Sequence, residues 1–478
     1  MDEQRSRENR PVNPRRKPRN KLQVFKEAYL PLIIAAAAVF LIVVFIIGSI
    51  SRSVEKKNAE IQASIEASSS AAALQQRLEA EALLLVAGAE ELAAQYDYLN
   101  AIALLESFTG TIADFPTISA KYNEYTQAQA QLVAWDDPGQ ILNLSFQLLV
   151  ADADRTFNHP VYANLFNRNF ITTEEFSRML LQLYENGYIL VSMEDFIETA
   201  TAEDGSINYK AKTLYLPAGK KPLMLTQTNV NYNIYLIDSD GDKFADKNGG
   251  GFGTRLLLDD SGEITCEMID SSGQAVTGDF DLVPILNDFV ESHPDFSYKG
   301  AKATLALTGY NGLFGYRTNA DAKDYFGVDA YNKAVEGATE VAYALREDGY
   351  DFACYTYANI GYGESSIAQI EGDLALWQQE VTPILGEVDT LVFAQNSDID
   401  SGTEGYTGDA ITTLQSNGFT KFIGFCNDGA SWVSLNGSYL RQGRLMVTGS
   451  TVAHKPEWFN SIFDANNILD PTRGDVPA

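Results

Sequence analysis

The stretch Lys221-Pro-Leu-Met-Leu-Thr-Gln-Thr-Asn229 decides the fold that this sequence predicts. A short apolar run follows a proline and ends in polar residues, which is typical of a buried β-strand with a polar end. A second stretch, Phe352-Ala-Cys-Tyr-Thr-Tyr-Ala-Asn359, has the same form. We therefore expect two strands that each deliver polar side chains to the edge of a sheet.

Strand-like runs alternate with helical stretches from residue 136 onward, and this alternation predicts a mainly parallel sheet. The strand-like runs are 142–150, 188–191, 222–225, 303–307, 352–357, 390–394 and 421–425, and the helical stretches are 172–187, 280–292, 334–348, 370–385 and 410–417.

Both opening stretches resemble metal-binding segments of the polysaccharide deacetylase (NodB-like) family, which read K-P-hydrophobic-T/S-[FQ]-D-D and F-A-S-H-[ST]-[WY]-x-H. Tyr310-Asn-Gly-Leu-Phe-Gly-Tyr-Arg-Thr318 resembles a stretch of a clostridial-type branch of that family. The resemblance extends over residues 138–475, with further matching segments at 170–176, 183–192, 279–289, 300–309, 439–444 and 463–471. It implies a distorted (β/α) barrel of seven or eight strands, with its site at the C-terminal ends of the strands.

The resemblance also shows which chemistry is missing. The family holds a divalent metal with one Asp and two His, and a second Asp acts as general base. Here Thr228 and Asn229 stand at the carboxylate positions, and Tyr355 and Asn359 at the imidazole positions. Tyrosine is a poor metal ligand at neutral pH because its pKa is roughly 10. The sequence therefore predicts a deacetylase-like fold that binds no zinc, and it favours a non-catalytic protein over an enzyme.

Other departures point the same way. Gln147 and Ala394-Gln-Asn-Ser397 replace a histidine and a Y-P-F-G-like strand end of the family. His454 is the one residue that matches the late motif supplying a general acid, and a structural or surface imidazole is the alternative interpretation. We count Thr228, Asn229, Tyr355, Asn359 and His454 as vestigial catalytic positions.

The predicted strand ends meet at one mouth of the barrel. Its expected ligand-binding residues are Gln227, Asn229, Tyr355, Tyr357, Asn359, Gln395 and Asn396, with Tyr232 and Trp432 as further aromatic candidates. Neutral amides beside tyrosine rings suit sugar hydroxyl and acetamido groups without a metal.

A third motif, Asp238-Ser-Asp-Gly-Asp-Lys-Phe-Ala-Asp246, spaces its acids as oxygen-rich calcium loops do. Its candidate calcium ligands are Asp238, Asp240, Asp242 and Asp246. The loop lacks the glycine and the final acid of an EF-hand, so a solvated acidic loop is the alternative.

The N-terminal region predicts a membrane anchor. Residues 30–50 carry no charge, and as a helix they reach roughly 31 Å, the thickness of a hydrocarbon core. Residues 1–28 hold nine Lys/Arg against four Asp/Glu, which keeps that end cytoplasmic. We expect a cytoplasmic tail (1–28), a single-pass signal-anchor helix (29–50), and extracellular residues from 51 onward.

Residues 51–135 predict a helical stalk. Helical stretches at 53–81, 83–108 and 118–135, with a turn at Tyr96-Asp-Tyr98, resemble a single tetratricopeptide-type unit. One such unit cannot bury its own apolar face, so we expect it to lean on the deacetylase-like domain (136–478). A spacer role is favoured over peptide binding.

Charge and cysteine content exclude several functions. The net charge of −29 argues against a nucleic-acid partner, because such binding needs positive charge. The three cysteines imply no disulfide framework and are read as buried small hydrophobes.

Three functions stay open at this point: an inert envelope protein that binds an N-acetylated wall glycan or a protein partner, an active deacetylase with a site rebuilt from Asp398, Asp400 and His454, and a structural or assembly protein. Fold alone does not decide between them.

Overall fold

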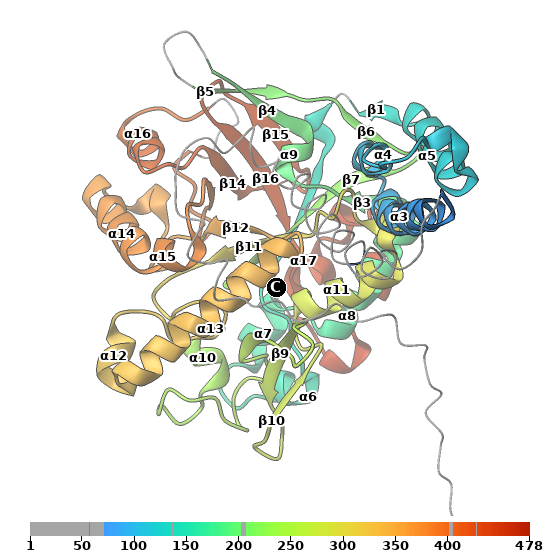
Figure 1. Ribbon diagram of the computed structural model, residues 1–478. Coiled ribbons are helices and arrows are strands. Elements are labelled where there is room, and N and C mark those ends of the chain that lie inside the picture. The colour runs from blue at the N-terminus through green and yellow to red at the C-terminus, as the bar shows by residue number, and fades with distance from the viewer. Residues whose placement is uncertain (1–56, 58–70, 136, 202–206, 401–404, 427) are drawn as a thin grey trace, which may run out of the picture.

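The computed structural model describes residue 57 and residues 71–135, 137–201, 207–400, 405–426 and 428–478 (Figure 1). The predicted tail and anchor, residues 1–50, lie outside the described residues. None of the helices in the described part is long and apolar enough to cross a membrane.

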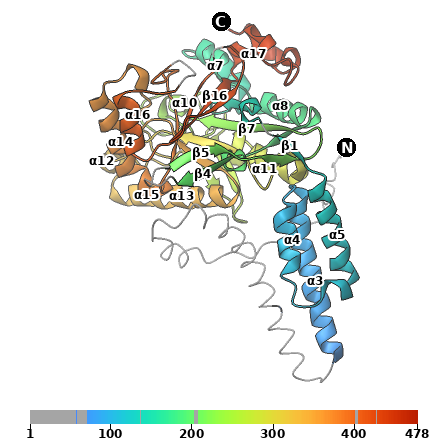
Figure 2. The ribbon, with the colours of Figure 1, turned by 90° about the horizontal axis from the view of Figure 1, so that it is seen from above.

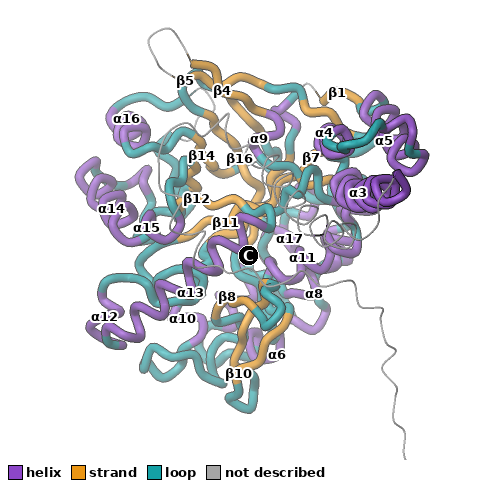
Figure 3. Tube along the Cα trace, in the orientation of Figure 1, coloured by secondary structure: helices purple, strands orange, loops and turns teal. Residues whose placement is uncertain are grey.

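Seven parallel strands close into a barrel, which confirms the predicted α/β barrel (Figure 3). In order around the barrel they are β11 (Ala303–Leu307), β12 (Asp351–Cys354), β13 (Thr390–Val392), β14 (Lys421–Phe425), β16 (Leu440–Met446), β2 (Leu142–Phe146) and β7 (Lys221–Thr228). The barrel closes where β7 pairs with β11, with Ala303 opposite Leu225.

Two barrel strands, β7 and β16, each pair with two different neighbours along one side. β7 pairs along its first residues with β3 (Tyr188–Leu190) and along its last residues with β11. In the same way β16 pairs first with the antiparallel β15 (Trp432–Leu435) and then with β2. The barrel is therefore open at the N-terminal ends of β7 and β16, where β3 and β15 pair with them, and closed at their C-terminal ends.

Alternate side chains of the strands face two different cores. Leu223 and Leu225 of β7 belong to the layer between the strands and the surrounding helices. Met224 between them belongs to a second cluster with interior residues such as Ala306 and Val392. The barrel interior also contains polar groups, since Asn143 donates to Gln442 at 2.8 Å and accepts from Thr226 at 2.9 Å. These buried amides and hydroxyls satisfy one another.

Helices cover the outside of the barrel and connect its strands. They are α6 (Ala153–Phe157), α7 (Ala163–Asn169), α8 (Thr173–Glu185), α9 (Met193–Phe196), α10 (Ile234–Ile237), α11 (Leu282–Ser292), α12 (Asp321–Phe326), α13 (Val328–Glu347), α14 (Ile367–Glu380), α15 (Thr382–Leu385), α16 (Asp409–Ser416) and α17 (Gly449–His454). A buried ion pair ties the C-terminal segment to α8, because Arg473 contacts the carboxylate of Glu175 at 2.7 Å.

Three small antiparallel sheets lie outside the barrel. They are β1 (Val133–Trp135) with β6 (Leu214–Leu216), β4 (Ile197–Thr201) with β5 (Ile207–Ala211), and β8 (Arg255–Leu258) with β9 (Ile264–Ile269) and β10 (Ala275–Gly278). The last sheet and the acidic loop before it form a long excursion between β7 and β11.

The stalk is a bundle of α3 (Ala71–Ala94), α4 (Tyr98–Glu106) and α5 (Pro116–Ala130) beside the barrel (Figure 2). It has an apolar core of its own that includes Ala89, Leu104 and Ile118. One polar link to the barrel is Asp295, which accepts hydrogen bonds from Tyr96 of the stalk, at 3.4 Å, and from Tyr184, at 3.3 Å. Lys220 adds an ion pair to the same carboxylate at 3.2 Å.

Candidate functional site

The rim is the set of residues that follow the C-terminal ends of four consecutive strands, β7, β11, β12 and β13. It comprises Asn229, Tyr310, Tyr355, Asn359, Gln395 and Asn396. Several of its residues have left-handed backbones, with φ of 63° at Asn229, 55° at Asn359 and 56° at Gln395. Such angles are uncommon outside glycine, and they end the strands abruptly. β12 stops at Cys354, earlier than expected, because Thr356 has φ of 59°.

Hydrogen bonds join neighbouring strand ends at the rim. The amide of Tyr355 donates to the carbonyl of Leu307 at 2.7 Å, and the amide of Tyr310 donates to the carbonyl of Tyr357 at 3.1 Å. Gln395 Nε2 donates to the carbonyl of Asn359 at 3.3 Å. The structure therefore brings the ends of β11, β12 and β13 together as the sequence predicts.

A buried carboxylate fixes the loop after β12. Asp373 of α14 accepts from the amides of Tyr357 at 2.6 Å and Ala358 at 2.8 Å, and from the hydroxyl of Tyr362 at 2.8 Å. Burial raises the pKa of Asp373, and these hydrogen bonds oppose the increase. Sequence analysis missed this residue. Its signal is an acid on the same helical face as the buried Ile370, Leu374 and Trp377.

Two rim amides present unused acceptors. Within the described part of the chain, Oδ1 of Asn229 and Oδ1 of Asn359 are buried and have no hydrogen-bond partner. Gln395 and Asn396 are exposed beside them. Since buried polar atoms are normally paired, these two oxygens are unsatisfied hydrogen-bond acceptors at the rim.

Arg444 places a buried cation next to the rim. Its guanidinium donates to the carbonyl of Phe393 at 2.9 Å and to Ser145 Oγ at 3.4 Å. Burial lowers the pKa of Arg444, and Tyr355 opposes that change. Among the described residues no carboxylate forms an ion pair with Arg444, whereas the other buried arginines, Arg441 and Arg473, have Asp398 and Glu175.

Four expected contributors to the mouth lie elsewhere. Gln227 has the outward direction of Leu223 and Leu225, and its Nε2 donates to Asp281 at 2.7 Å. The hydroxyl of Tyr232 donates to the same carboxylate at 2.6 Å, and the hydroxyl of Tyr357 donates to Glu380 of α14 at 2.6 Å. Trp432 stacks on the outward-facing Arg441, 5.3 Å from its guanidinium carbon. Three side-chain groups and the Trp432 ring thus have partners outside the barrel mouth, whereas Oε1 of Gln227 has no hydrogen-bond partner among the described residues. Their role as ligand contacts stays a prediction.

Thr228 and His454 are the two vestigial catalytic positions that lie outside the rim as defined above. Thr228 is fully buried, and its hydroxyl donates to the carbonyl of Phe146 at 3.3 Å. His454 is exposed on α17, where Nε2 lies 2.9 Å from the carbonyl of Val476. His454 thus contacts the C-terminal segment, and among the described residues no hydrogen bond or ion pair links it to the rim.

Asp398 and Asp400, the acids of a possible rebuilt site, take part in structural contacts. Asp398 accepts from Tyr406 at 2.9 Å and pairs with Arg441 at 3.4 Å. Asp400 contributes its carbonyl to the same arginine at 3.0 Å. This arrangement anchors a loop and does not bring Asp398 and Asp400 to His454.

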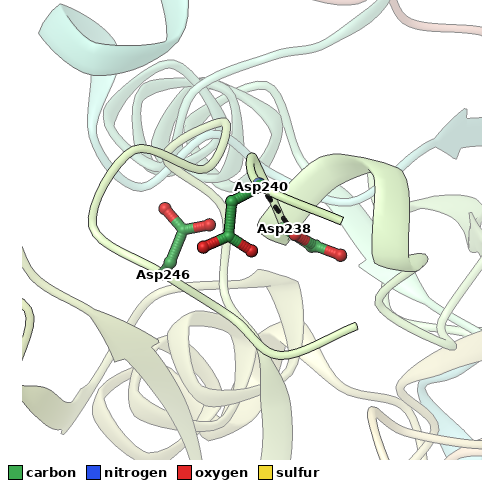
Figure 4. Close-up of side chains that lie close together, drawn as sticks. All are labelled: Asp238, Asp240 and Asp246. Atoms are coloured by element: carbon green, nitrogen blue, oxygen red, sulfur yellow. Dashed lines mark hydrogen bonds between the residues drawn. The ribbon is translucent and has the colours of Figure 1, made fainter. Parts of the chain in front are cut away.

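The acidic loop does bring carboxylates together. Ligand atoms of Asp238, Asp240 and Asp246 lie within 4.8 Å of one another, and Asp240 lies between the other two in Figure 4. Asp238 accepts from the amides of Asp240 at 3.0 Å and Gly241 at 2.7 Å. Although burial alone raises the pKa of Asp246, hydrogen bonds from Ser239 and Asn248 lower it overall. Asp242 is outside this group of three.

A groove of about 1150 Å³ lies between the acidic loop and the segment before α7. Tyr162, Tyr235 and Tyr310 line it, together with His159 and Asn311. Tyr310 is also a rim residue, so the groove and the rim are continuous.

Comparisons with known proteins add little to these observations. No protein-family model matches the sequence, and no curated protein matches it. A solved structure, "Streptococcus pyogenes deacetylase PplD in complex with acetate", aligns with 67% of this chain and 95% of its own at 13% identity, with a TM-score of 0.33. A likeness this distant carries no argument about activity.

Proposed function

We propose that this chain is a non-catalytic, polysaccharide deacetylase-like protein of the cell envelope whose rim binds an N-acetylated glycan. The observation that carries the proposal is the pair of unpartnered oxygens on Asn229 and Asn359, which follow the ends of β7 and β12, where β12 also delivers Tyr355 to the rim. Amide oxygens accept hydrogen bonds from sugar hydroxyl and acetamido N–H groups, and a phenol ring covers an apolar sugar face. The left-handed backbone and Asp373 hold these groups in place before a ligand arrives.

The position of Arg444 supports a role without a metal. The family resemblance places a metal ligand at position 355, and the guanidinium lies beside Tyr355. Two unit charges of the same sign about 4 Å apart repel by about 4 kcal/mol at the effective dielectric of a protein site. A resident guanidinium thus opposes a divalent cation, while it attracts the oxygen atoms of a neutral or anionic ligand.

The binding test is a titration of the purified chain with N-acetylated wall oligosaccharides, followed by tyrosine fluorescence or amide chemical shifts. We expect a saturable change at millimolar sugar that is lost in Asn229→Ala and in Tyr355→Ala. Tyr215→Ala is the matched control, because Tyr215 is an exposed tyrosine on β6, away from the rim. The proposal would be rejected if millimolar sugar caused no change, or if both rim variants changed as much as the wild-type chain.

The catalytic part is tested separately. We expect the purified chain to carry no equivalent of tightly held zinc, cobalt or nickel by elemental analysis, and to release no acetate from chitin oligomers or peptidoglycan. One equivalent of retained metal, or acetate release that chelators abolish, would instead favour the active-deacetylase alternative.

The envelope location rests on the uncharged segment 30–50 and the basic tail before it. Protease added to intact, wall-stripped cells is expected to digest the chain from about residue 51 onward and to spare the tail. A protected barrel domain would show that the orientation is reversed.

A further inference from the structure

The groove beside the rim has features of a binding surface that the rim alone does not explain. Its volume of about 1150 Å³ exceeds the roughly 300–1,000 Å³ typical of pockets for single small molecules. It is open along one side and is formed by the segment 152–162, the start of the acidic loop and the residues after β11.

Tyrosine rings mark the course of this groove. Tyr162 and Tyr235 are 38% and 47% exposed, which is high for rings in a concave surface. Although Tyr235 is about half exposed, desolvation by the surrounding protein raises its pKa to about 12, with smaller effects from Tyr310, Tyr162 and Tyr355. These four phenols are therefore electrostatic neighbours, and Tyr235 stays protonated at neutral pH. Within the described residues the hydroxyls of Tyr162 and Tyr235 make no hydrogen bond.

The rings are held by their surroundings. His159 stacks on Tyr162 with ring centroids 5.3 Å apart, and its Nδ1 accepts the amide of Tyr162 at 3.0 Å. On the other side, Asn311 Oδ1 accepts the amide of Ile234, one residue before Tyr235, at 3.1 Å. The stacked Tyr162 ring and the tied main chain before Tyr235 lower the entropic cost of binding.

Arg317 links the groove to the rim. Its guanidinium donates to the carbonyls of Asn311 at 2.8 Å and Tyr232 at 2.9 Å, so it ties the segment after β11 to the segment after β7. Burial lowers the pKa of Arg317 to about 10, which leaves it charged at neutral pH. The two sides of the groove and the rim thus form one connected surface.

We propose that this groove binds further units of a linear, neutral glycan chain whose N-acetylated unit occupies the rim. This inference rests on the proposed function and specifies its ligand as a polymer. Flat phenol rings stack on sugar faces, and their free hydroxyls pair with sugar hydroxyls. The acidic residues of the groove, such as Asp152, Asp154 and Asp238, disfavour a polyanionic chain.

The test is a length series of chitin oligomers, from one to six units, titrated into the purified chain by calorimetry. We expect affinity to increase with length, and Tyr162→Ala/Tyr235→Ala to remove that increase, with roughly three- to tenfold weaker binding of the longer oligomers per ring lost. Tyr162→Phe/Tyr235→Phe keeps the rings and is expected to restore most of the gain. Tyr215→Ala is the control for an exposed tyrosine outside the groove.

The outcomes separate the two proposals. Affinity that is independent of length but lost in Asn229→Ala keeps the rim function and overturns the groove inference. An increase with length that survives in Tyr162→Ala/Tyr235→Ala, in a variant that melts like the parent chain, also overturns it. Absence of binding at every length overturns both.

Discussion

The guanidinium carbon of Arg444 lies 5.6 Å from the centroid of the Tyr355 ring, and within the described residues no carboxylate pairs with this cation. The charge is held by a carbonyl, a hydroxyl and aromatic faces, including Phe425 at 4.5 Å. A buried ion without a counter-ion is costly for the folded state, so Arg444 is not expected to stabilise the fold as a paired arginine does.

This arrangement predicts that replacing two buried arginines has different effects on the free energy of unfolding. Arg444→Met removes an uncompensated charge and is expected to change the free energy of unfolding by less than about 1.5 kcal/mol. Arg473→Met leaves Glu175 buried without its partner and is expected to lower it by about 3–5 kcal/mol. Urea denaturation of the two variants gives both values. Equal losses would show that Arg444 contributes to stability as strongly as a paired residue.

Asp281 predicts an unusual pH dependence. It is fully buried, and burial raises its pKa while hydrogen bonds from Tyr232, Leu149 and Gln227 oppose the increase. Between the unfolded pKa and this higher folded pKa the folded state binds more protons, so the contribution of Asp281 to stability increases as the pH falls. Wild type should therefore gain stability relative to Asp281→Asn between about pH 7 and about pH 4.5.

Chemical denaturation at both pH values measures this difference. Asp288→Asn is the control, because Asp288 is an exposed acid on helix α11, which begins directly after Asp281 in the chain. A constant difference between wild type and Asp281→Asn would mean that the two states bind protons equally at this site.

The cysteines are expected to be inert in the folded chain. Cys266, Cys354 and Cys426 are all buried and free. Burial raises the pKa of Cys426 to about 12 and raises those of the other two well above the usual value, so little thiolate forms. Ellman's reagent at pH 8 should find no rapidly reacting thiol in the native protein and three after denaturation. A fast reaction in the native protein would show that the structure opens enough to expose one of the three buried thiols.

The acidic loop is expected to bind Ca²⁺ in the range of about 0.1–1 mM, as extracellular calcium modules do. Three carboxylates already converge there and are oriented by backbone amides. Calorimetry should show binding that Asp238→Asn and Asp246→Asn abolish. Asp242→Asn is the matched control, since Asp242 lies outside the group of three. Absence of heat at millimolar Ca²⁺ would leave the segment as a solvated acidic loop.

The sequence predicts the barrel well where strands are apolar. The runs at 303–307 and 421–425 coincide with β11 and β14. It does not reveal β16, because Arg441, Gln442 and Arg444 give that strand the composition of a loop. The structure explains this discrepancy, since the barrel interior is partly polar and supplies partners for Gln442.

Side-chain direction explains most of the differences between the predicted and the observed site. Gln227 follows Leu223 and Leu225 at a period of two, so the alternation of a strand already places it outside the barrel. The turn after β12 is different, because the left-handed Thr356 and the distant Asp373 determine where Tyr357 points. A contact between residues so far apart in the chain cannot be inferred from local pattern alone.

Asp295 joins the stalk to the barrel. One carboxylate receives Tyr96 from the helical bundle and Tyr184 and Lys220 from the barrel, so a force applied to the bundle reaches the barrel through a shared joint. A flexible tether would let the barrel turn freely, whereas this joint restricts its rotation. If residues 30–50 anchor the chain in a membrane, the bundle sets the distance of the rim from the membrane and its orientation.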